Sequence, residues 1–284
     1  MGVVSDLRES RELLVNLTQR EVKGKYKRTI LGQVWSLANP IATMLIYTAV
    51  FSFILKVRPE TGDPSGLHVF ALFLMCALLP WSFFLNVVNG GMGSLTGNEN
   101  LIKKVSFPRV VLVLSSAASW MYTWLLEMAV LVVVIFVIGS VDGAAGMSRV
   151  LLYVPLALVF MVLLSFFAMG MAMLLSIANV YFRDTQYLVG IVFQVWFYLT
   201  PILYPVSLVA DREEMSMGVG GITLLDLYLA NPMAEYAEAF RALLYHNRLP
   251  DLSNTVACVF WSAVVFVVGY AVFQRHEKGL AEAL

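Results

Sequence analysis

The chain has 284 residues, of which 60% are hydrophobic and 13% are charged. Ordinary globular chains have about 45–50% apolar residues, glycine included, and about 25% charged residues. A soluble protein of this length has too much surface for its volume to hide that much apolar area from water. The composition indicates a protein embedded in lipid, and it excludes a soluble enzyme, a disordered chain, a disulfide scaffold and a nucleic-acid-binding protein. The 19 basic and 19 acidic residues cancel, so only the positions of the charges are informative.

The first element in chain order is an amphipathic helix over Leu7–Val22. Projection at 100° per residue places six apolar residues on one half of the helix: Leu7, Leu13, Leu14, Val15, Leu17 and Val22. Arg11, Thr18 and Glu21 interrupt this apolar half. The pattern predicts a helix lying along the membrane surface within an interface segment of residues 1–34. A soluble helix packed on a partner protein remains the alternative.

Six stretches that follow are apolar and long enough to span a membrane, given that a helix needs about 20 residues to cross roughly 30 Å of hydrocarbon. They are Trp35–Leu55, Leu67–Val88, Val110–Ile138, Leu151–Ala178, Tyr187–Tyr204 and Ser253–Phe273. The third and fourth must tilt or protrude because they are longer than needed. None alternates apolar and polar residues as barrel strands do. We predict an all-α membrane protein, with six spans in residues 35–273 and a cytoplasmic tail over residues 274–284.

The basic residues predict the orientation of these spans. Of the 19, 13 fall on the side that holds both termini and 6 on the other. Because Lys and Arg are enriched in cytoplasmic loops, both termini are expected to be cytoplasmic, in a multi-pass protein of the cell's inner membrane.

The longest outer loop, Pro205–Leu252, contains two apolar segments. Ile222–Leu229 is apolar, and Met233–Tyr245 has the periodicity of a helix. Asn231-Pro232 between them offers an N-cap followed by proline at the first helical position. We expect two short helices that dip back into the membrane, with a helical hairpin on the outer surface as the alternative.

Sequence motifs for catalysis or metal binding are absent: there is no phosphate-binding loop, and the three histidines share no metal-ligand spacing. The spans are nearly free of ionisable residues, so they hold almost no groups that could form a proton relay. Glu127, midway in the third span, is the exception. It is either a functional acid or a hydrogen-bonding partner of a neighbouring helix. The chain is therefore predicted to be a transport subunit without its own energy source rather than an enzyme.

Two cytoplasmic turns are candidates for contact with a partner that supplies energy. The first combines apolar and basic residues, with a short helix over Glu99–Lys104 and a stop before Pro108. The residues that we assign to it are Asn98, Glu99, Asn100, Leu101, Ile102, Lys103, Lys104, Val105, Ser106 and Phe107. Alternatively, its basic residues are simply membrane anchors. The second turn places Arg183 beside Asp184, as a hinge latch or a capped turn.

Aromatic residues are the remaining signal in the spans. Tryptophan and tyrosine at span ends usually anchor a protein at the membrane interface. Rings well inside a span could instead line a path for a polysaccharide, since sugars present apolar C–H faces and polar hydroxyls. The candidates for such a lining are Trp81, Phe84, Trp120, Tyr122, Trp124, Trp196 and Tyr198.

Together, several motifs in this order resemble the membrane subunit of type-2 ABC polysaccharide exporters. After the basic amphipathic N-terminal segment, the matching stretches are Gly32–Pro40 (GQVWSLANP), Asn100–Arg109 (NLIKKVSFPR), Asn179–Asp184 (NVYFRD), Thr200–Pro205 (TPILYP), Asn231–Met233 (NPM) and Glu277–Glu282 (EKGLAE). The resemblance covers essentially the whole chain. Members of this family export O-antigens, capsules, teichoic acids and mycobacterial galactan, and the alanine- and valine-rich composition favours a galactan exporter permease.

The resemblance implies a homodimer of six-span subunits with two ATPase subunits, which would bind ATP and magnesium, and no cofactor in this chain. It implies that the segment around Asn98–Ser106 is the coupling helix. Residues of the N-terminal segment and the second turn are implied as an interface or gate: Arg20, Lys23, Lys25, Arg28, Arg183 and Asp184. A polyprenyl-diphosphate-linked polysaccharide would enter from the cytoplasmic leaflet and pass an aromatic-lined channel. An ABC-2 exporter of drugs or lipids is the alternative, whereas a membrane-embedded transferase would need convergent acidic or histidine residues.

Overall fold

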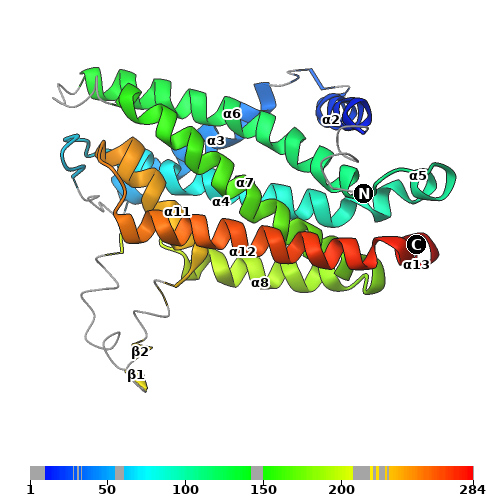
Figure 1. The fold of residues 1–284 in the computed structure, drawn as a ribbon. Helices are drawn as coiled ribbons and strands as arrows, with labels where there is room; N and C mark the ends of the chain where they lie inside the picture. Colours follow the sequence, from blue (N-terminus) through cyan, green and yellow to red (C-terminus); the bar gives the residue numbers. More distant parts are fainter. Residues whose placement is uncertain are drawn as a thin grey trace.

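The computed structural model describes residues 10–27, 29–30, 32, 34–54, 61–141, 150–206, 218–219, 222–223, 228 and 230–283. In these residues the long helices run side by side as an elongated bundle (Figure 1). Four of the described helices are long and apolar enough to cross a membrane: α4 (Phe70–Ser94), α6 (Val110–Val141), α7 (Val150–Tyr181) and α12 (Leu252–His276). The prediction of a helical membrane protein is confirmed at this level.

Helix α4 is the central helix of the bundle. Within its apolar stretch 83% of the residues are buried, against 28% in α6, 39% in α7 and 22% in α12. It packs against α6 and α7 and also against the shorter α3 and α8. The peripheral helices leave valine, leucine and phenylalanine side chains exposed along their lengths, as expected where the surrounding solvent is lipid rather than water.

Helices α7 and α12 approach each other closely through two glycines. A Cβ atom added at Gly269 would overlap the carbonyl oxygen of Gly170, and one added at Gly170 would overlap the backbone of Val265. Small residues let helix backbones meet where hydrocarbon provides no hydrophobic drive for association. These two helices therefore form one tightly packed pair.

Two apolar helices are shorter than the four long ones. Helix α3 (Val34–Tyr47) continues as the π-helix η1 (Thr48–Ile54), which together match the predicted first span closely. Helix α8 (Thr185–Leu199) ends before Pro201, five residues short of the predicted boundary at Tyr204. Its 15 residues extend only about 22 Å at 1.5 Å per residue.

The second half of the predicted outer pair forms as expected. Asn231 is the N-cap of α11 (Pro232–Phe240), and its side chain accepts a hydrogen bond from the N–H of Met233 at 3.0 Å. Helix α11 continues as the π-helix η5 (Arg241–His246), and both elements pack inside the bundle against α4 and α7. Most of their side chains are buried.

The first half of that pair differs from the prediction. Ile222–Thr223 is not helical but forms strand β2, paired antiparallel with β1 (Gly218–Val219). Gly220-Gly221 between the strands and the β-branched Ile222 and Thr223 favour a hairpin over a helix. The rest of the expected helix lies outside the described residues apart from Tyr228.

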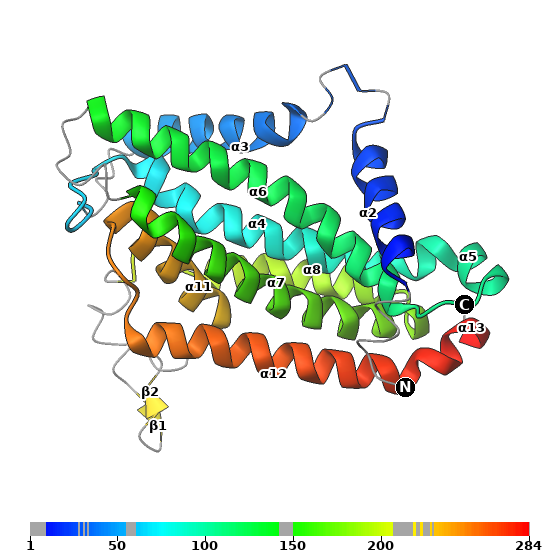
Figure 2. The same cartoon turned by 45° about the horizontal axis from the view of Figure 1, so that its top comes forward.

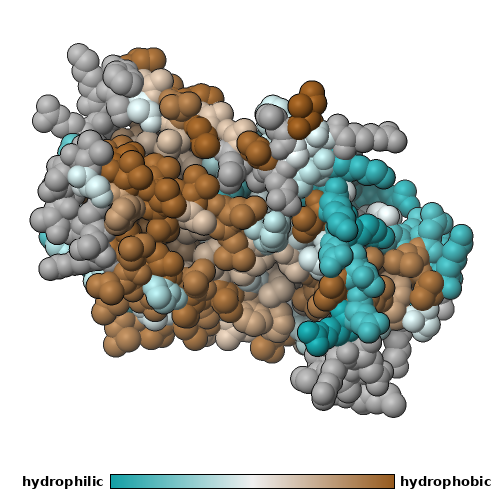
Figure 3. Space-filling model, turned by 90° about the horizontal axis from the view of Figure 1, so that it is seen from above, coloured by the Kyte–Doolittle hydropathy of each residue, from teal (hydrophilic) through white to brown (hydrophobic). Residues whose placement is uncertain are grey.

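Polar elements gather at one end of the bundle, here called the α5 end. Helix α2 (Arg11–Lys25), η2 (Thr96–Asn98), α5 (Glu99–Lys104), η6 (Glu277–Gly279) and α13 (Leu280–Ala283) lie there, with α2 running across the long helices (Figure 2). Figure 3 shows hydrophilic surface at this end and hydrophobic surface over most of the remainder. Helix α2 extends past the predicted limit of Val22, and residues 7–9 of the predicted helix lie outside the described residues.

Candidate functional site

The candidate coupling segment folds as predicted, with a short helix over Glu99–Lys104. The Nζ of Lys103 donates to Oε1 of Glu99 at 2.6 Å, one helical turn away. This hydrogen bond holds the pKa of Glu99 below its ordinary value, and the charges of Lys103 and Arg183 act in the same direction. Ile102 is buried, which fixes the helix to the bundle. Lys104, Val105 and Ser106 are exposed, so this side of the segment is open to a partner.

The interface helix α2 reaches the coupling segment through Arg20. Its Nη2 donates to Oδ1 of Asn98 at 2.7 Å and lies 3.1 Å from Oε1 of Glu21. The Nδ2 of Asn98 in turn donates to the carbonyl oxygen of Ser94 at the end of α4, at 2.8 Å. The structure therefore brings together two groups of residues, the interface helix and the coupling segment, that the sequence assigned separately.

The remaining interface candidates are not gathered at one place. Lys23 is exposed on α2, and Arg28 lies outside the described residues. Arg183 and Asp184 form the turn between α7 and α8, where Asp184 is the N-cap residue of α8 and its carbonyl oxygen accepts from Tyr187 and Leu188. The Asp184 side chain makes no capping hydrogen bond, so both readings of this turn, a hinge latch or a capped turn, stay predictions.

A groove of about 630 Å³ separates α2 from the glycine-rich end of α4. Polar residues and glycines line it, among them Arg20, Asn89, Gly93, Asn98 and Ser116. Gly93 and Gly97 have open space where a Cβ would be, so this wall of the groove is bare backbone. Helix α2 covers the groove on one side.

Lys25, at the end of α2, lies against the first half of α6. Its Nζ is 3.2 Å from the ring centroid of Trp120, and it has no hydrogen-bond partner among the described residues. Burial lowers the pKa of Lys25 to about 7, although the charges of Glu21 and Glu127 partly oppose this effect. Trp120 and Glu127 are seven residues apart and so share one face of α6.

This contact gives Glu127 a charged neighbour that sequence reasoning missed. The spacing of Trp120, Thr123 and Glu127 could have indicated a common face, but not that α2 would lie over it. The hydroxyl groups of Tyr26 and Thr123, 3.5 Å apart, mark the same contact. The predicted intramembrane acid thus faces the interface helix, and its role stays a prediction.

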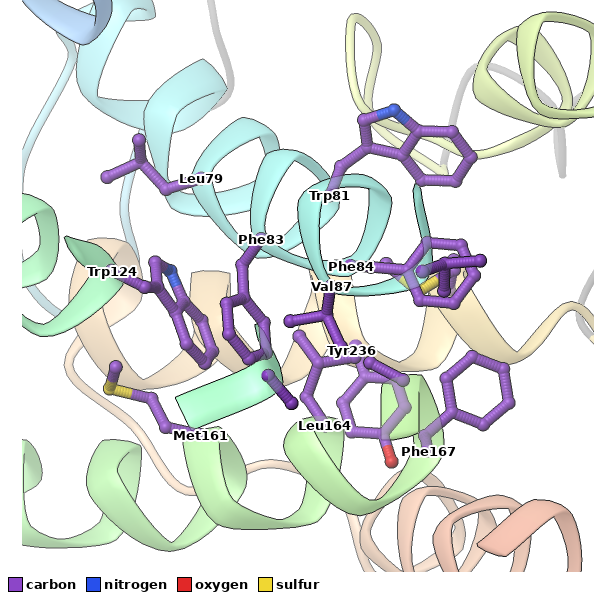
Figure 4. Close-up of a cluster of buried hydrophobic side chains, with 14 of the residues drawn as sticks. Leu79, Trp81, Phe83, Phe84, Val87, Trp124, Met161, Leu164, Phe167 and Tyr236 are labelled. Carbon is purple, nitrogen blue, oxygen red and sulfur yellow. The ribbon is translucent and has the colours of Figure 1, made fainter. Parts of the chain in front are cut away.

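The candidate lining residues divide into buried and exposed groups. Trp81 meets Trp196 edge-on with ring centroids 6.0 Å apart, and Phe84 lies 5.4 Å from Trp196. Trp124 stacks on Phe83 at 4.0 Å, as Figure 4 shows. Trp81, Phe84 and Trp124 are at most 2% exposed. In this structure these three rings are enclosed by the chain's own side chains and hold α4 to α6 and α8.

The other candidates are accessible to different degrees. Tyr122 is 40% exposed and Tyr198 is 61% exposed. Trp120 and Trp196 are half-buried, and Nε1 of Trp196 donates to Oδ1 of Asn231 at 2.7 Å. Tyr122 and Tyr198 are therefore the candidate rings most open to a passing polymer.

Arg241, one of the six basic residues that the sequence assigned to the outer side, is buried and fastens the opposite end of the bundle. Arg241 is 0% exposed, and its Nη2 donates to the carbonyl oxygen of Ile202 at 2.7 Å. Its Nη1 lies 2.9 Å from Oε1 of Glu238, and its guanidinium carbon lies 3.8 Å from the ring centroid of Phe73. Buried charges need such partners, so Arg241 ties η5 to α4 and to the segment after α8.

Asn231 adds to the same fastening. Its Nδ2 donates to Oγ1 of Thr200 at 3.0 Å and to the carbonyl oxygen of Leu199 at 3.3 Å, while its Oδ1 accepts from Trp196. The last turn of α8 is therefore held to the N-cap of α11. A single asparagine serves both elements, which accounts for the Asn231-Pro232 pair in the sequence.

The described residues form a helical bundle with one polar end and a fastened opposite end, and comparison with known proteins gives its family. Residues 12–245 match the ABC-2 type transporter family, and the chain belongs to it. It is 28% identical to the O-antigen export system permease protein RfbA of Myxococcus xanthus, over 99% of both chains. It is 27% identical to RfbA of Klebsiella pneumoniae, over 96% of this chain and 95% of the relative, and 18% identical to the polysialic acid transport protein KpsM of Escherichia coli, over 92% of each. The predicted family and the prediction of a transport subunit rather than an enzyme are confirmed.

The contact of α2 with α6 at Lys25 should become more stable as pH rises. The docked lysine has a pKa of about 7 against 10.5 for the free side chain, so between these values the docked state binds fewer protons and gains stability with pH. Spin labels on Lys23→Cys and Gly97→Cys, both exposed positions, would report the distance between α2 and η2. The native Cys76 and Cys258 are fully buried and should not react.

We expect a single short distance at pH 9 and a growing second population at pH 6. Lys25→Met should remove this pH dependence because it removes the titrating group. A distance distribution that is the same at both pH values in the labelled protein would contradict the assignment.

Proposed function

We propose that this chain is the transmembrane subunit of an ATP-driven exporter that moves a lipid-linked polysaccharide from the cytoplasmic to the outer side of the inner membrane. The observation that carries this proposal is similarity along nearly the whole chain to permeases named for O-antigen and polysialic acid export. The alternative, an exporter of drugs or lipids, is compatible with the family match but is not supported by the names of these relatives. Galactan as the particular polymer stays a prediction.

The topology that we propose has six spans, with α3–η1 and α8 added to the four long helices. The basic α5 end would face the cytoplasm, since Lys and Arg favour that side. Helix α11 and η5 would then be re-entrant elements from the outside, shielded from lipid by α4, α7 and α12. This shielding is the condition under which irregular backbone is tolerated at membrane depth.

The α5 segment would dock in the partner ATPase, which would bind ATP and magnesium in two copies per exporter. Lys104, Val105 and Ser106 offer an exposed surface of mixed charge and apolarity. Helix α2, fastened to this segment by the bond between Arg20 and Asn98, would act as the gate over the polar groove.

The polymer path is proposed along the exposed side of α8, at a homodimer interface. Gln186, Gly190, Gln194 and Tyr198 recur every four residues on one face of the helix, and all four are exposed. An amide side chain left without hydrogen bonds in hydrocarbon costs several kcal/mol (roughly 2–7). This stripe is therefore better suited to a water-filled path or to a second copy of the chain than to lipid.

Alanine at Lys103, Lys104 and Phe107 should uncouple ATP hydrolysis from export while the protein stays in the membrane. Side chains central to an interface contribute roughly 1–2 kcal/mol each, so we expect at least tenfold weaker ATPase docking, at about 1.4 kcal/mol per factor of ten. Export of the host's lipid-linked polysaccharide and ATP hydrolysis would both be measured in proteoliposomes. Lys27→Ala, an exposed lysine on α2's side of the bundle, is the matched control. Normal export by the triple variant would defeat the proposal.

Changes on the α8 stripe should slow export without changing assembly. Tyr198→Ala removes an exposed ring, and loss of one stacking contact of about 0.5–1.5 kcal/mol corresponds to a roughly two- to twelvefold effect. Gln194→Leu should act in the same direction, whereas Val195→Ala, an exposed apolar neighbour, should not. Equal export rates in all three variants, at equal amounts of assembled complex, would rule out this face as the path.

A further inference from the structure

The long helix α6 is capped by a residue from the far end of the chain. The N–H of Arg109, just before the first residue of α6, donates to Oε1 of Glu277 at 2.6 Å, across 168 residues of sequence. The first N–H groups of a helix have no partners within it, and the helix dipole favours a negative charge there. The carboxylate of Glu277 meets both needs at the start of α6.

A second hydrogen bond runs in the opposite direction between the same two residues. Nη1 of Arg109 donates to the carbonyl oxygen of Glu277 at 2.5 Å. Each residue thus uses its side chain to bind the other's backbone, and both bonds are assisted by charge. We call this pair of residues the clasp. It fixes the backbone at residue 109 to the backbone at residue 277.

The tail segment, Glu277–Ala283, is itself held in place. Leu280 is fully buried, and α13 contacts both α5 and α7. The ring of Tyr181 at the end of α7 meets His276 edge-on, with centroids 6.3 Å apart. Figures 1 and 2 both show α13 at the α5 end of the bundle. The tail segment therefore lies between the coupling segment and the ends of α7 and α12.

The linker from α5 to α6 explains why the clasp is needed to hold residue 109 in place. Val105 has an extended backbone after α5, and Pro108 has no N–H to donate. A displacement of α5 could be absorbed by bending of residues 105–109 unless residue 109 were held. On the other side of the clasp, α12 is locked to α7 by the close approach of Gly170 and Gly269.

We propose that the tail segment is a second coupling route, in which the clasp passes displacement of α5 to α12 and through it to α7. This route would act beside the direct continuity of α5 with α4 and α6, and it rests on the proposed docking of α5 in the ATPase. Arg109 and Glu277 are positioning residues in this route: they act through α5 and contact neither nucleotide nor polymer.

The test is the amount of polymer exported per ATP hydrolysed by the full complex with its ATPase. The probe is lipid-linked polysaccharide extracted from the host's membranes and supplied in proteoliposomes. A capping contact of this kind shifts an equilibrium by about five- to thirtyfold. Glu277→Ala should lower export per ATP by about fivefold or more, with complex amount and ATP hydrolysis retained. Glu277→Gln should fall between, since its amide oxygen can still accept from Arg109 without a charge.

Arg275→Ala, at an exposed position in the last turn of α12 next to the tail segment, is the matched control and should behave like the unchanged protein. Unchanged export per ATP in Glu277→Ala would overturn the proposal. So would a fall of export and hydrolysis in proportion to the amount of complex, because that result means that the clasp serves folding alone.

Amide exchange at the start of α6 gives an independent reading. Exchange at Arg109 and Val110 in the assembled complex should rise in Glu277→Ala but not in Arg275→Ala, and unchanged exchange would count against the clasp. If the Lys103, Lys104 and Phe107 variant uncouples transport and Glu277→Ala does not, this inference alone fails. If only Glu277→Ala uncouples, the proposed docking through α5 fails, and this inference fails with it because it rests on that docking.

Discussion

Hydrocarbon supplies no hydrogen-bond partners, and this constraint shapes every part of the molecule described here. Several hydroxyl side chains inside the helices bind their own backbone: Ser165 bonds to the carbonyl of Met161, and Ser262 to that of Cys258. Larger polar groups find partners on other elements, as Asn179 does at the carbonyl of Met92. Among the described residues, charged side chains collect mainly at the α5 end, which we propose to lie outside the hydrocarbon.

The same constraint explains the different character of the two ends of the bundle. At the end of the bundle that holds α11 and η5, the buried Arg241 and the half-buried Asn231 bind backbone carbonyls after α8 and at its end, so that end is fastened by contacts between elements. At the α5 end, one exposed hydrogen bond from Arg20 to Asn98 joins α2 to the coupling segment, and the two part-buried hydrogen bonds of the clasp join the tail segment to the start of α6. If the partner ATPase displaces the α5 segment, we expect motion to begin at the α5 end and to be resisted at the end of the bundle that holds α11 and η5.

The sequence predicted much of this architecture because apolar length and proline position are local signals. The first span, the short α8 and the N-cap at Asn231 all follow from such signals. The helix expected to begin at Ile222 was wrong because Gly220-Gly221 and two β-branched residues favour a hairpin. Helix α8 ends earlier than predicted because Pro201 stops it and Asn231 binds its last turn.

Contacts between distant segments could not be predicted from one sequence. Nothing local in Lys25 indicates that it will lie over Trp120, or in Glu277 that it will cap α6. The sequence assigned Arg241 to an outer loop, because its burial depends on how η5 packs against the other helices. The aromatic residues illustrate the same limit. Trp81, Phe84 and Trp124 are residue types that could line a polymer path, but packing places their rings in the interior. Exposed rings such as Tyr198 are better suited to that role.

The central claim is that this polypeptide is a conduit without an energy source of its own. Reconstitution of the purified chain in vesicles, first alone and then with its ATPase, tests that claim directly. Alone, the chain should neither hydrolyse ATP nor carry lipid-linked polysaccharide across the bilayer. The complex of the chain with its ATPase should do both when ATP is supplied. Hydrolysis or transport of the glycolipid by the chain alone would contradict the account.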